Sequence, residues 1–321
     1  MPPLPRPPIR MDRVLDDPGV VRTLVERHAP YWPVQRYFAN AAEYAALSGA
    51  GDAVDMPVAP VFRGNWTDEG RALPGVEVFL HHPGLRAAAA RLFDARVVRP
   101  HLVYANLTWQ LPFPQGVGHT DVPAFRGFDR TRHPITFLSI MGHSGLFEDV
   151  RVRIATAVAW FYAGGDGGFE YWPDGPDAPS RVHEGAIGNT ALVGDNDFMW
   201  HRVRPVGRLA DGMPSLSRDS RLVRRGDAWA IVDDARTIAE LPFDRLRISV
   251  SWKALVFADE QEARLHDEHT ADIGLDQVVA RFHADLARRG IAHDVPADPE
   301  RDPAFIRLLA ATYVRQPAPA A

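Results

Sequence analysis

The stretch RLRISVSWKALVF at 245–257 alternates between two kinds of side chain over most of its length. The odd-numbered positions are polar, namely Arg247, Ser249 and Ser251. The even-numbered positions are apolar, namely Leu246, Ile248, Val250 and Trp252. Successive side chains of a strand point to opposite faces, so this alternation predicts a strand with its apolar face in a core. The other face would line a polar interior or solvent.

The segment 117–204 predicts further strands. Turns rich in Gly, Pro and Asp separate short apolar runs here, among them ITFLSIM, IATAVAWFY, NTALVG and DFMWHRV. This spacing is typical of an antiparallel β-barrel or sandwich rather than of repeated βαβ units. A period-two stretch at 97–111 precedes the segment. The pattern RLVRRGDAWAIVDDARTIA within 205–243 predicts a hairpin inserted between core strands.

Helical patterns flank the β region. They cover 14–47 with interruptions at the prolines 30 and 33, then 82–95, 258–289 and 303–315. The Pro-rich residues 1–12 predict a flexible lead, because proline opposes both helix and strand ladder. We therefore expect a mainly β fold with flanking helices. A single domain would span 13–321, with helices over 13–95, a β core over 97–257 and C-terminal helices over 258–315.

The composition favours a protein that acts on small molecules. A formal charge of −5 without long charge runs offers no basic surface for nucleic acid or an anionic membrane. The absence of cysteine excludes disulfides and Cys-ligated metal sites, so metal ligands would have to be His and carboxylates. No stretch reaches the roughly 18 consecutive apolar residues of a membrane span. We expect a cytoplasmic protein with a small-molecule substrate.

The segment GHTDV at 118–122 carries the first candidate metal ligands. In an extended segment His119 and Asp121 project to one face while Thr120 points away. His201 in the apolar run DFMWHRV would be the third ligand, with His183 in the loop-like PSRVHEG as a rival. Two His and one carboxylate leave three coordination positions open, which suits Fe(II) that must bind a bidentate oxoacid and then O₂. Zinc usually completes a tetrahedron instead.

Arg247 is the candidate anion-binding residue. An arginine on an inward face needs an anionic partner, because an unpaired buried charge is costly. Its planar fork fits a carboxylate bidentately, and the distal carboxylate of 2-oxoglutarate is a suitable partner. A structural ion pair with a nearby acid is the alternative interpretation of this arginine.

In this order the motifs resemble those of the 2-oxoglutarate/Fe(II)-dependent dioxygenase superfamily: His-x-Asp, then a distal His, then Arg-x-Ser on a late core strand. The resemblance runs from about residue 97 to 257. It is carried by GHTD at 118–121, GGDGGFEYW at 164–172, GNTALVGDNDFMWHRV at 188–203 and RISVSW at 247–252.

The resemblance implies a double-stranded β-helix, a jelly-roll or cupin-like core. Its iron ligands would be His119, Asp121 and His201. Arg247 and Ser249 would hold the distal carboxylate of 2-oxoglutarate. Such an oxygenase consumes O₂ and 2-oxoglutarate and releases succinate and CO₂. It would hydroxylate an unactivated C–H bond of a small molecule such as an amino acid or a natural-product intermediate.

Two details of the motifs bear on that reading. Related halogenases carry Gly or Ala in place of the carboxylate ligand, so Asp121 favours hydroxylation or desaturation, and hydroxylation before desaturation. In the family the arginine follows the distal histidine closely, whereas here the segment 205–243 separates His201 from Arg247. Arg245 and Lys253 have the same strand parity and are the alternative anchors.

Further contacts are expected around this centre. Arg126 in PAFRGFDR and the pair Tyr171 and Trp172 would line the mouth of the barrel, with Arg126 pairing with a substrate carboxylate. Asn106 and Thr108, on the strand before the metal motif, would contact the cosubstrate. Arg126 as a surface charge and the two aromatics as core residues are the alternatives.

Two other functions stay open at this point. A cupin-like metalloenzyme that does not use 2-oxoglutarate would keep the three ligands and have no need of Arg247. A non-catalytic β-barrel binding protein would use His119 and Asp121 as structural residues.

Overall fold

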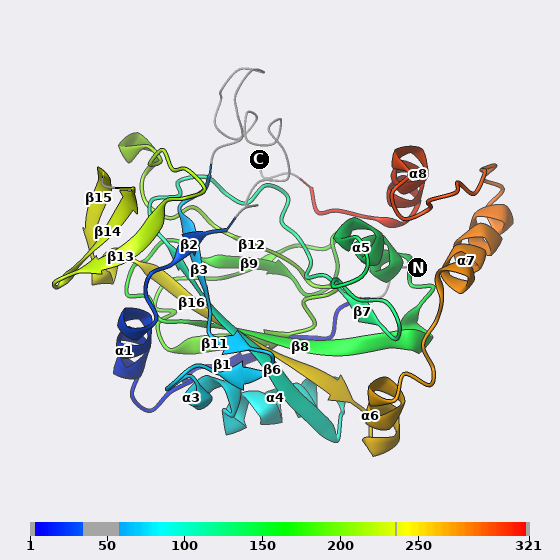
Figure 1. Cartoon of the computed structure of the whole chain (residues 1–321), viewed down its shortest axis with the longest axis horizontal. Helices are drawn as coiled ribbons and strands as arrows, with labels where there is room; N and C mark the ends of the chain where they lie inside the picture. Colours follow the sequence, from blue (N-terminus) through cyan, green and yellow to red (C-terminus); the bar gives the residue numbers. More distant parts are fainter. Residues whose placement is uncertain (1–3, 35–57, 235, 319–321) are drawn as a thin grey trace.

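The structure is a computed structural model that describes residues 4–34, 58–234 and 236–318. Its centre is a large antiparallel sheet (Figure 1). The strand order is β1 (Ile9–Met11), β11 (Thr190–Gly194), β8 (Arg151–Trp160), β16 (Arg247–Phe257), β6 (Val97–Thr108), β3 (Val61–Asn65) and β2 (Trp32–Pro33). The short strand β7 (Ala124–Phe125) pairs with β8 outside this order.

A smaller sheet consists of β10 (Arg181–His183), β9 (Phe169–Trp172) and β12 (Trp200–Val203), in that order. An antiparallel bridge between His119 and His201 adds the segment around 119 beside β12. The chain alternates between the two sheets: β6, the 119 segment, β8, β9 with β10, β11, β12 and β16. This alternation is the topology of a double-stranded β-helix, and the fold class predicted from the sequence is confirmed.

The outer face of the large sheet is covered by helices α3 (Glu77–Leu80) and α4 (Pro83–Phe93). Helix α4 begins at Pro83, because proline is well tolerated at the first position of a helix. The preceding residue, His82, caps the helix by accepting a hydrogen bond from the Leu85 amide. The apolar parity of β16 packs into this layer, and Trp252 Nε1 donates to the Leu80 carbonyl at 3.2 Å. The alternation in 245–257 therefore separates a core face from a polar face, as predicted. The polar side chains point to the inside of the β-helix. Helix α1 (Gly19–Arg27) packs on the same core.

A second apolar cluster joins α5 (Ile135–Ser144), α7 (Leu275–Arg288) and α8 (Pro303–Tyr313), on one side of the sheets in Figure 1. The sequence interpretation of ITFLSIM as a strand is wrong, because this run lies in α5. The run has only seven residues, and periodicity in so short a stretch does not separate a buried strand from part of a helix. Helix α6 (Glu260–Asp267) leads from β16 toward this cluster.

The segment between β12 and β16 forms a three-stranded sheet and not the simple hairpin expected. Its strands are β13 (Arg221–Arg225), β14 (Ala228–Asp233) and β15 (Arg236–Pro242). Trp229 and Leu241 from this sheet are buried in the main core, so the insertion is part of the packed structure. The remaining short elements are the hairpin β4 (Thr67–Asp68) and β5 (Arg71–Ala72) and the 3₁₀ turns η1 (Glu148–Val150), η2 (Leu209–Asp211) and η3 (Phe243–Arg245).

Two further expectations differ from the structure. Residues 1–12 were expected to form a flexible lead, but Ile9–Met11 within it form β1, which pairs with β11. His183 lies in β10 rather than in a loop. Of the helical pattern at 14–47, the part from residue 35 onward lies outside the described residues. No helix in the described ranges is long and apolar enough to cross a membrane.

Candidate metal centre and cavity

The two candidate histidine ligands face each other across a backbone bridge. His119 and His201 exchange both backbone N–H···O bonds at 2.9 Å, and their rings lie 4.3 Å apart between centroids. Asp121 is placed beside them by its amide, which donates to the Asn196 carbonyl at 2.8 Å. Ligand atoms of the three side chains all lie within 4.8 Å of one another. Thr120 points away, toward His143 Nε2 at 3.3 Å.

The protonation states of these ligands suit a metal ion. Burial, together with the neighbouring His201, lowers the pKa of His119 to about 3. Burial also lowers the pKa of His201, so both rings are neutral at physiological pH. The backbone carbonyl of Met199 lies 2.8 Å from His201 Nδ1. It accepts the ring N–H at that position and leaves Nε2 as the metal-binding nitrogen.

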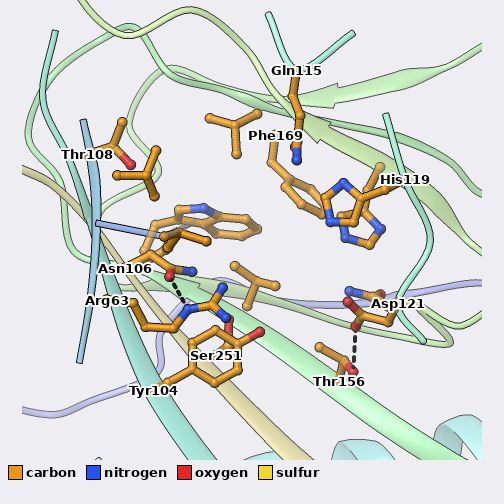
Figure 2. A pocket seen from close by; sticks show the side chains of 18 of the residues that line it. Arg63, Tyr104, Asn106, Thr108, Gln115, His119, Asp121, Thr156, Phe169 and Ser251 are labelled. Carbon is orange, nitrogen blue, oxygen red and sulfur yellow. Dashed lines mark hydrogen bonds between the residues drawn. The ribbon is translucent and has the colours of Figure 1, made fainter. Parts of the chain in front are cut away.

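Asp121 is ionised although it is enclosed. Burial opposes its charge, but the Lys253 ammonium and the two imidazoles hold the pKa of its carboxyl well below the usual range. Lys253 Nζ lies 2.8 Å from Oδ2. Thr156 Oγ1 donates to the same oxygen at 3.2 Å, as Figure 2 shows. Both contacts use Oδ2, which leaves Oδ1 for a metal ion. The residues present therefore fit a cation such as Fe(II), with two neutral nitrogens and one carboxylate oxygen.

The three ligands open into a cavity of about 480 Å³ between the two sheets. Its wall includes the polar parity of β16, namely Arg247, Ser249 and Ser251, and also Asn106 and Thr108 of β6. The register explains this grouping, since Arg247 pairs with Thr108 and Ser249 with Asn106 on adjacent strands. The four residues expected to contact the cosubstrate, Arg247, Ser249, Asn106 and Thr108, thus line the same cavity as the three candidate metal ligands.

Arg247 is buried in this wall, with 2% of its surface exposed. Its Nε donates to the carbonyl of Gly167 at 2.5 Å. The long separation from His201 is taken up by the three-stranded insertion, which leaves β12 and β16 in their places in the two sheets. The two alternative anchors are placed differently: Arg245 lies in η3 with its side chain exposed, and Lys253 pairs with Asp121.

Three residues expected at the barrel mouth are not brought to this cavity. Arg126 donates to the backbone carbonyls of Ala271 and Asp149 and lines a different hollow. Tyr171 packs against the apolar cluster around Trp160, and Trp172 is buried beneath the Arg202 guanidinium. The expectation that these side chains contact the substrate therefore finds no support in their positions.

The rival ligand His183 is also elsewhere. It is buried, with Nε2 2.7 Å from Thr190 Oγ1, and it does not belong to the group of residues able to hold a metal. It is a satisfied core histidine next to the Trp160 ring, 4.9 Å between centroids.

The structure adds cavity residues that the sequence interpretation missed, among them Arg63, Tyr104, Gln115 and Phe169. Arg63 lies on β3, and its Nε donates to Asn106 Oδ1 at 2.9 Å. Tyr104 has the parity of Asn106 and Thr108 on β6, which was a usable signal. Nothing in the stretch VFRGN at 61–65 indicates that its arginine reaches the same cavity.

No protein-family model matches the sequence, and no curated protein matches it. Solved structures do. One is an oxidoreductase of the 2OG-Fe(II) oxygenase family from Burkholderia pseudomallei, with 11% identity over 78% of this chain and 85% of that chain and a TM-score of 0.38. Another is a prolyl hydroxylase in complex with a peptide, from Trichoplax adhaerens, with 8% identity, coverage of 81% and 87%, and a TM-score of 0.40.

A third match is HygX from Streptomyces hygroscopicus with nickel, 2-oxoglutarate and hygromycin B bound, at 12% identity, coverage of 78% and 83%, and a TM-score of 0.38. TM-scores of this size are too low to transfer a residue's role from one protein to another. The interpretation of the site rests on the side chains described above.

Proposed function

We propose that this protein is an Fe(II)- and 2-oxoglutarate-dependent oxygenase that hydroxylates a C–H bond of a small molecule. The observation that carries the proposal is the shared cavity of His119, Asp121 and His201 with the buried guanidinium of Arg247. A metal ligand set with open positions and a carboxylate anchor in the same enclosure are what a chelating oxoacid with a second carboxylate requires.

The chain's own residues would divide the work between two ends of the cavity. Two neutral imidazoles and the Asp121 carboxylate would hold Fe(II) on one face. Arg247 would receive the distal carboxylate of 2-oxoglutarate, and the Ser249 hydroxyl on the same face of β16 would add a donor. Asn106 and Thr108 on the paired strand are the neighbouring polar groups.

Bound iron supplies O₂ activation coupled to decarboxylation of the oxoacid. The overall reaction balances as R–H, O₂ and 2-oxoglutarate giving R–OH, succinate and CO₂. One oxygen atom enters the substrate and the other enters succinate. The protein's part is to hold the oxoacid and to aim one C–H bond at the iron, because orientation is the main service that such a cavity provides.

The test begins with the metal-free protein under anaerobic conditions. Fe(II) is added, followed by 2-oxoglutarate, and the visible metal-to-ligand charge-transfer band is recorded. We expect the band in the wild type, no band in His201→Ala, and a 2-oxoglutarate affinity weakened by roughly 10-fold or more in Arg247→Gln. Arg245→Gln is the matched control, since this arginine is exposed two residues earlier.

Other results would select another function. Fe(II) binding without a 2-oxoglutarate band, unchanged by Arg247→Gln, would point to a metalloenzyme of the same barrel class that does not use the oxoacid. The absence of stoichiometric Fe(II) binding would point to a binding protein in which His119 and Asp121 are structural.

A further inference from the structure

We propose that Arg63 is the anchor for a negatively charged group of the substrate, so that the substrate class is a small organic acid or another small anion. This inference rests on the proposed function and adds to it the chemistry that the far side of the cavity recognises. Arg63 takes the role that the sequence interpretation had given to Arg126.

Two contacts fix the Arg63 side chain in place. Its Nε donates to Asn106 Oδ1 at 2.9 Å, and its guanidinium lies over the Tyr104 ring at 4.3 Å from the centroid. An exposed arginine usually moves among many rotamers, whereas this one is held by a hydrogen bond and a cation–π contact to the same strand, β6. The contacts leave the two terminal Nη groups as donors for a ligand.

Within the described ranges, no carboxylate lies within ion-pair distance of Arg63. Asp121 is the acidic residue of the cavity wall, and its Oδ2 is already bound by Lys253. Arg63 is therefore a cation in the cavity that no acid among the described residues neutralises.

The cavity also has an excess of positive charge when the metal and 2-oxoglutarate are bound as proposed. In the proposed complex 2-oxoglutarate places one carboxylate on the metal and the other on Arg247. Asp121 and 2-oxoglutarate together carry fewer negative charges than the positive charges carried by Fe(II), Lys253 and the two arginines. An anionic substrate group reduces this imbalance, and charge complementarity of this kind favours the matching ligand.

The direction of the side chain supports the same assignment. Figure 2 shows Arg63 reaching into the cavity from the side of Tyr104 and Asn106, with Asp121 and His119 on the opposite side. A ligand whose anionic group binds Arg63 would extend across the cavity toward the metal ligands. At about 480 Å³ the cavity has the size of a small-molecule site.

The experiment measures binding and does not depend on turnover. Anaerobic protein loaded with Fe(II) and 2-oxoglutarate is titrated by calorimetry with a panel of amino acids, arylcarboxylic acids and phosphate monoesters. Each carboxylic acid is paired with its neutral carboxamide. We expect the wild type to prefer acids over amides, and Arg63→Gln to lose that preference with a roughly 10-fold to 100-fold weaker affinity for the acids. The ester arm distinguishes a phosphate group from a carboxylate.

Arg63→Lys, which keeps the charge, should retain part of the preference. Arg71→Gln, on the exposed hairpin strand β5, is the matched control and should behave as the wild type. The inference is wrong if no anion binds better than its neutral partner, or if the preference survives in Arg63→Gln. It is also wrong if this variant loses 2-oxoglutarate affinity instead, since Arg63 would then serve the cosubstrate. Failure of the proposed function looks different, because the charge-transfer band would then be absent in the wild type.

Discussion

Lys253 Nζ lies 2.8 Å from Asp121 Oδ2, so the single lysine of the chain neutralises the one carboxylate of the candidate metal centre. Burial opposes the lysine's charge, but Asp121 more than compensates and the pKa of Lys253 is raised. The pair also restricts Asp121 to one free oxygen for a metal. We therefore expect Lys253 to position Asp121 rather than to anchor 2-oxoglutarate.

We expect Lys253→Met to destabilise the metal-free protein and to make its thermal stability depend more on Fe(II) than that of the wild type. Removing one partner of a buried ion pair costs about 3–5 kcal/mol, because the remaining charge is left uncompensated. A bound cation replaces the lost charge, so Fe(II) should raise the melting temperature of the variant by more than that of the wild type. Anaerobic thermal unfolding with and without Fe(II) measures this. Thr156→Val, which removes a neutral hydrogen bond to the same oxygen, should cost about 1 kcal/mol. Equal metal-induced shifts in Lys253→Met and the wild type would refute the idea.

Gly167→Ala should weaken 2-oxoglutarate binding without touching the metal ligands. A Cβ at Gly167 would lie 2.6 Å from Arg247 Cδ and 2.8 Å from its Nε, so the arginine would have to move. We expect a roughly 10-fold or greater loss in the charge-transfer titration with 2-oxoglutarate, and Fe(II) binding near the wild-type level. The control is Gly185→Ala, where φ is also positive, at +81°, but the added Cβ meets nothing within 4 Å. An equal loss in the control would assign the effect to backbone strain.

Arg151→Met should destabilise the loop that supports Asp121. Arg151 is buried and pairs with Asp195 and Asp197, at 3.1 Å from Asp197 Oδ2, and the carbonyl of the residue between them accepts the Asp121 amide. Leaving two buried acids without their partner should cost about 3–5 kcal/mol in chemical unfolding. The exposed pair of Arg99 with Asp267 offers the comparison, since Arg99→Met should cost much less than Arg151→Met.

The stability of the metal-free protein should fall as the pH drops from 7 to 5.5. Burial lowers the pKa of His201 and brings that of His119 to about 3, whereas the unfolded chain takes up protons near the usual histidine value of about 6.5. Between those values the unfolded state binds more protons, so the free energy of unfolding rises with pH. His201→Gln should show a shallower slope in denaturant titrations, and His81→Gln, at an exposed position, should not. Identical slopes in all three proteins would contradict this.

What could be predicted from the sequence is what depends on strand parity. The alternation along 245–257 correctly separated the cavity face of β16 from its core face, and the i, i+2 spacing paired His119 with Asp121. Parity also put Asn106 and Thr108 on one face of their strand, although it did not say whether that face points into the cavity.

What could not be predicted depends on partners distant in the chain. Arg63 reaches the cavity only because β3 pairs with β6, and no local pattern specifies that pairing. Lys253 lies on the same face of β16 as Arg247, but its ion pair with Asp121 depends on the packing of β16 beside the segment around 119, which the sequence does not show. The apolar run in α5 was too short for its periodicity to distinguish a helix from a strand.

The central position of β16 has a consequence for how such a cavity can change. This strand pairs with β6 along its length and with β8 from Ser249 to Val256, and it carries both Arg247 and Lys253. A shift of one residue in the pairing register of β16 would turn both side chains to the opposite face. The part of the cavity around Arg247 therefore forms only when β16 pairs in the correct register. Arg63 sits on a shorter strand with an exposed side chain, where replacement costs little stability. Under the function proposed above, substitutions at position 63 would change which substrate binds and leave the residues proposed to hold iron and 2-oxoglutarate in place.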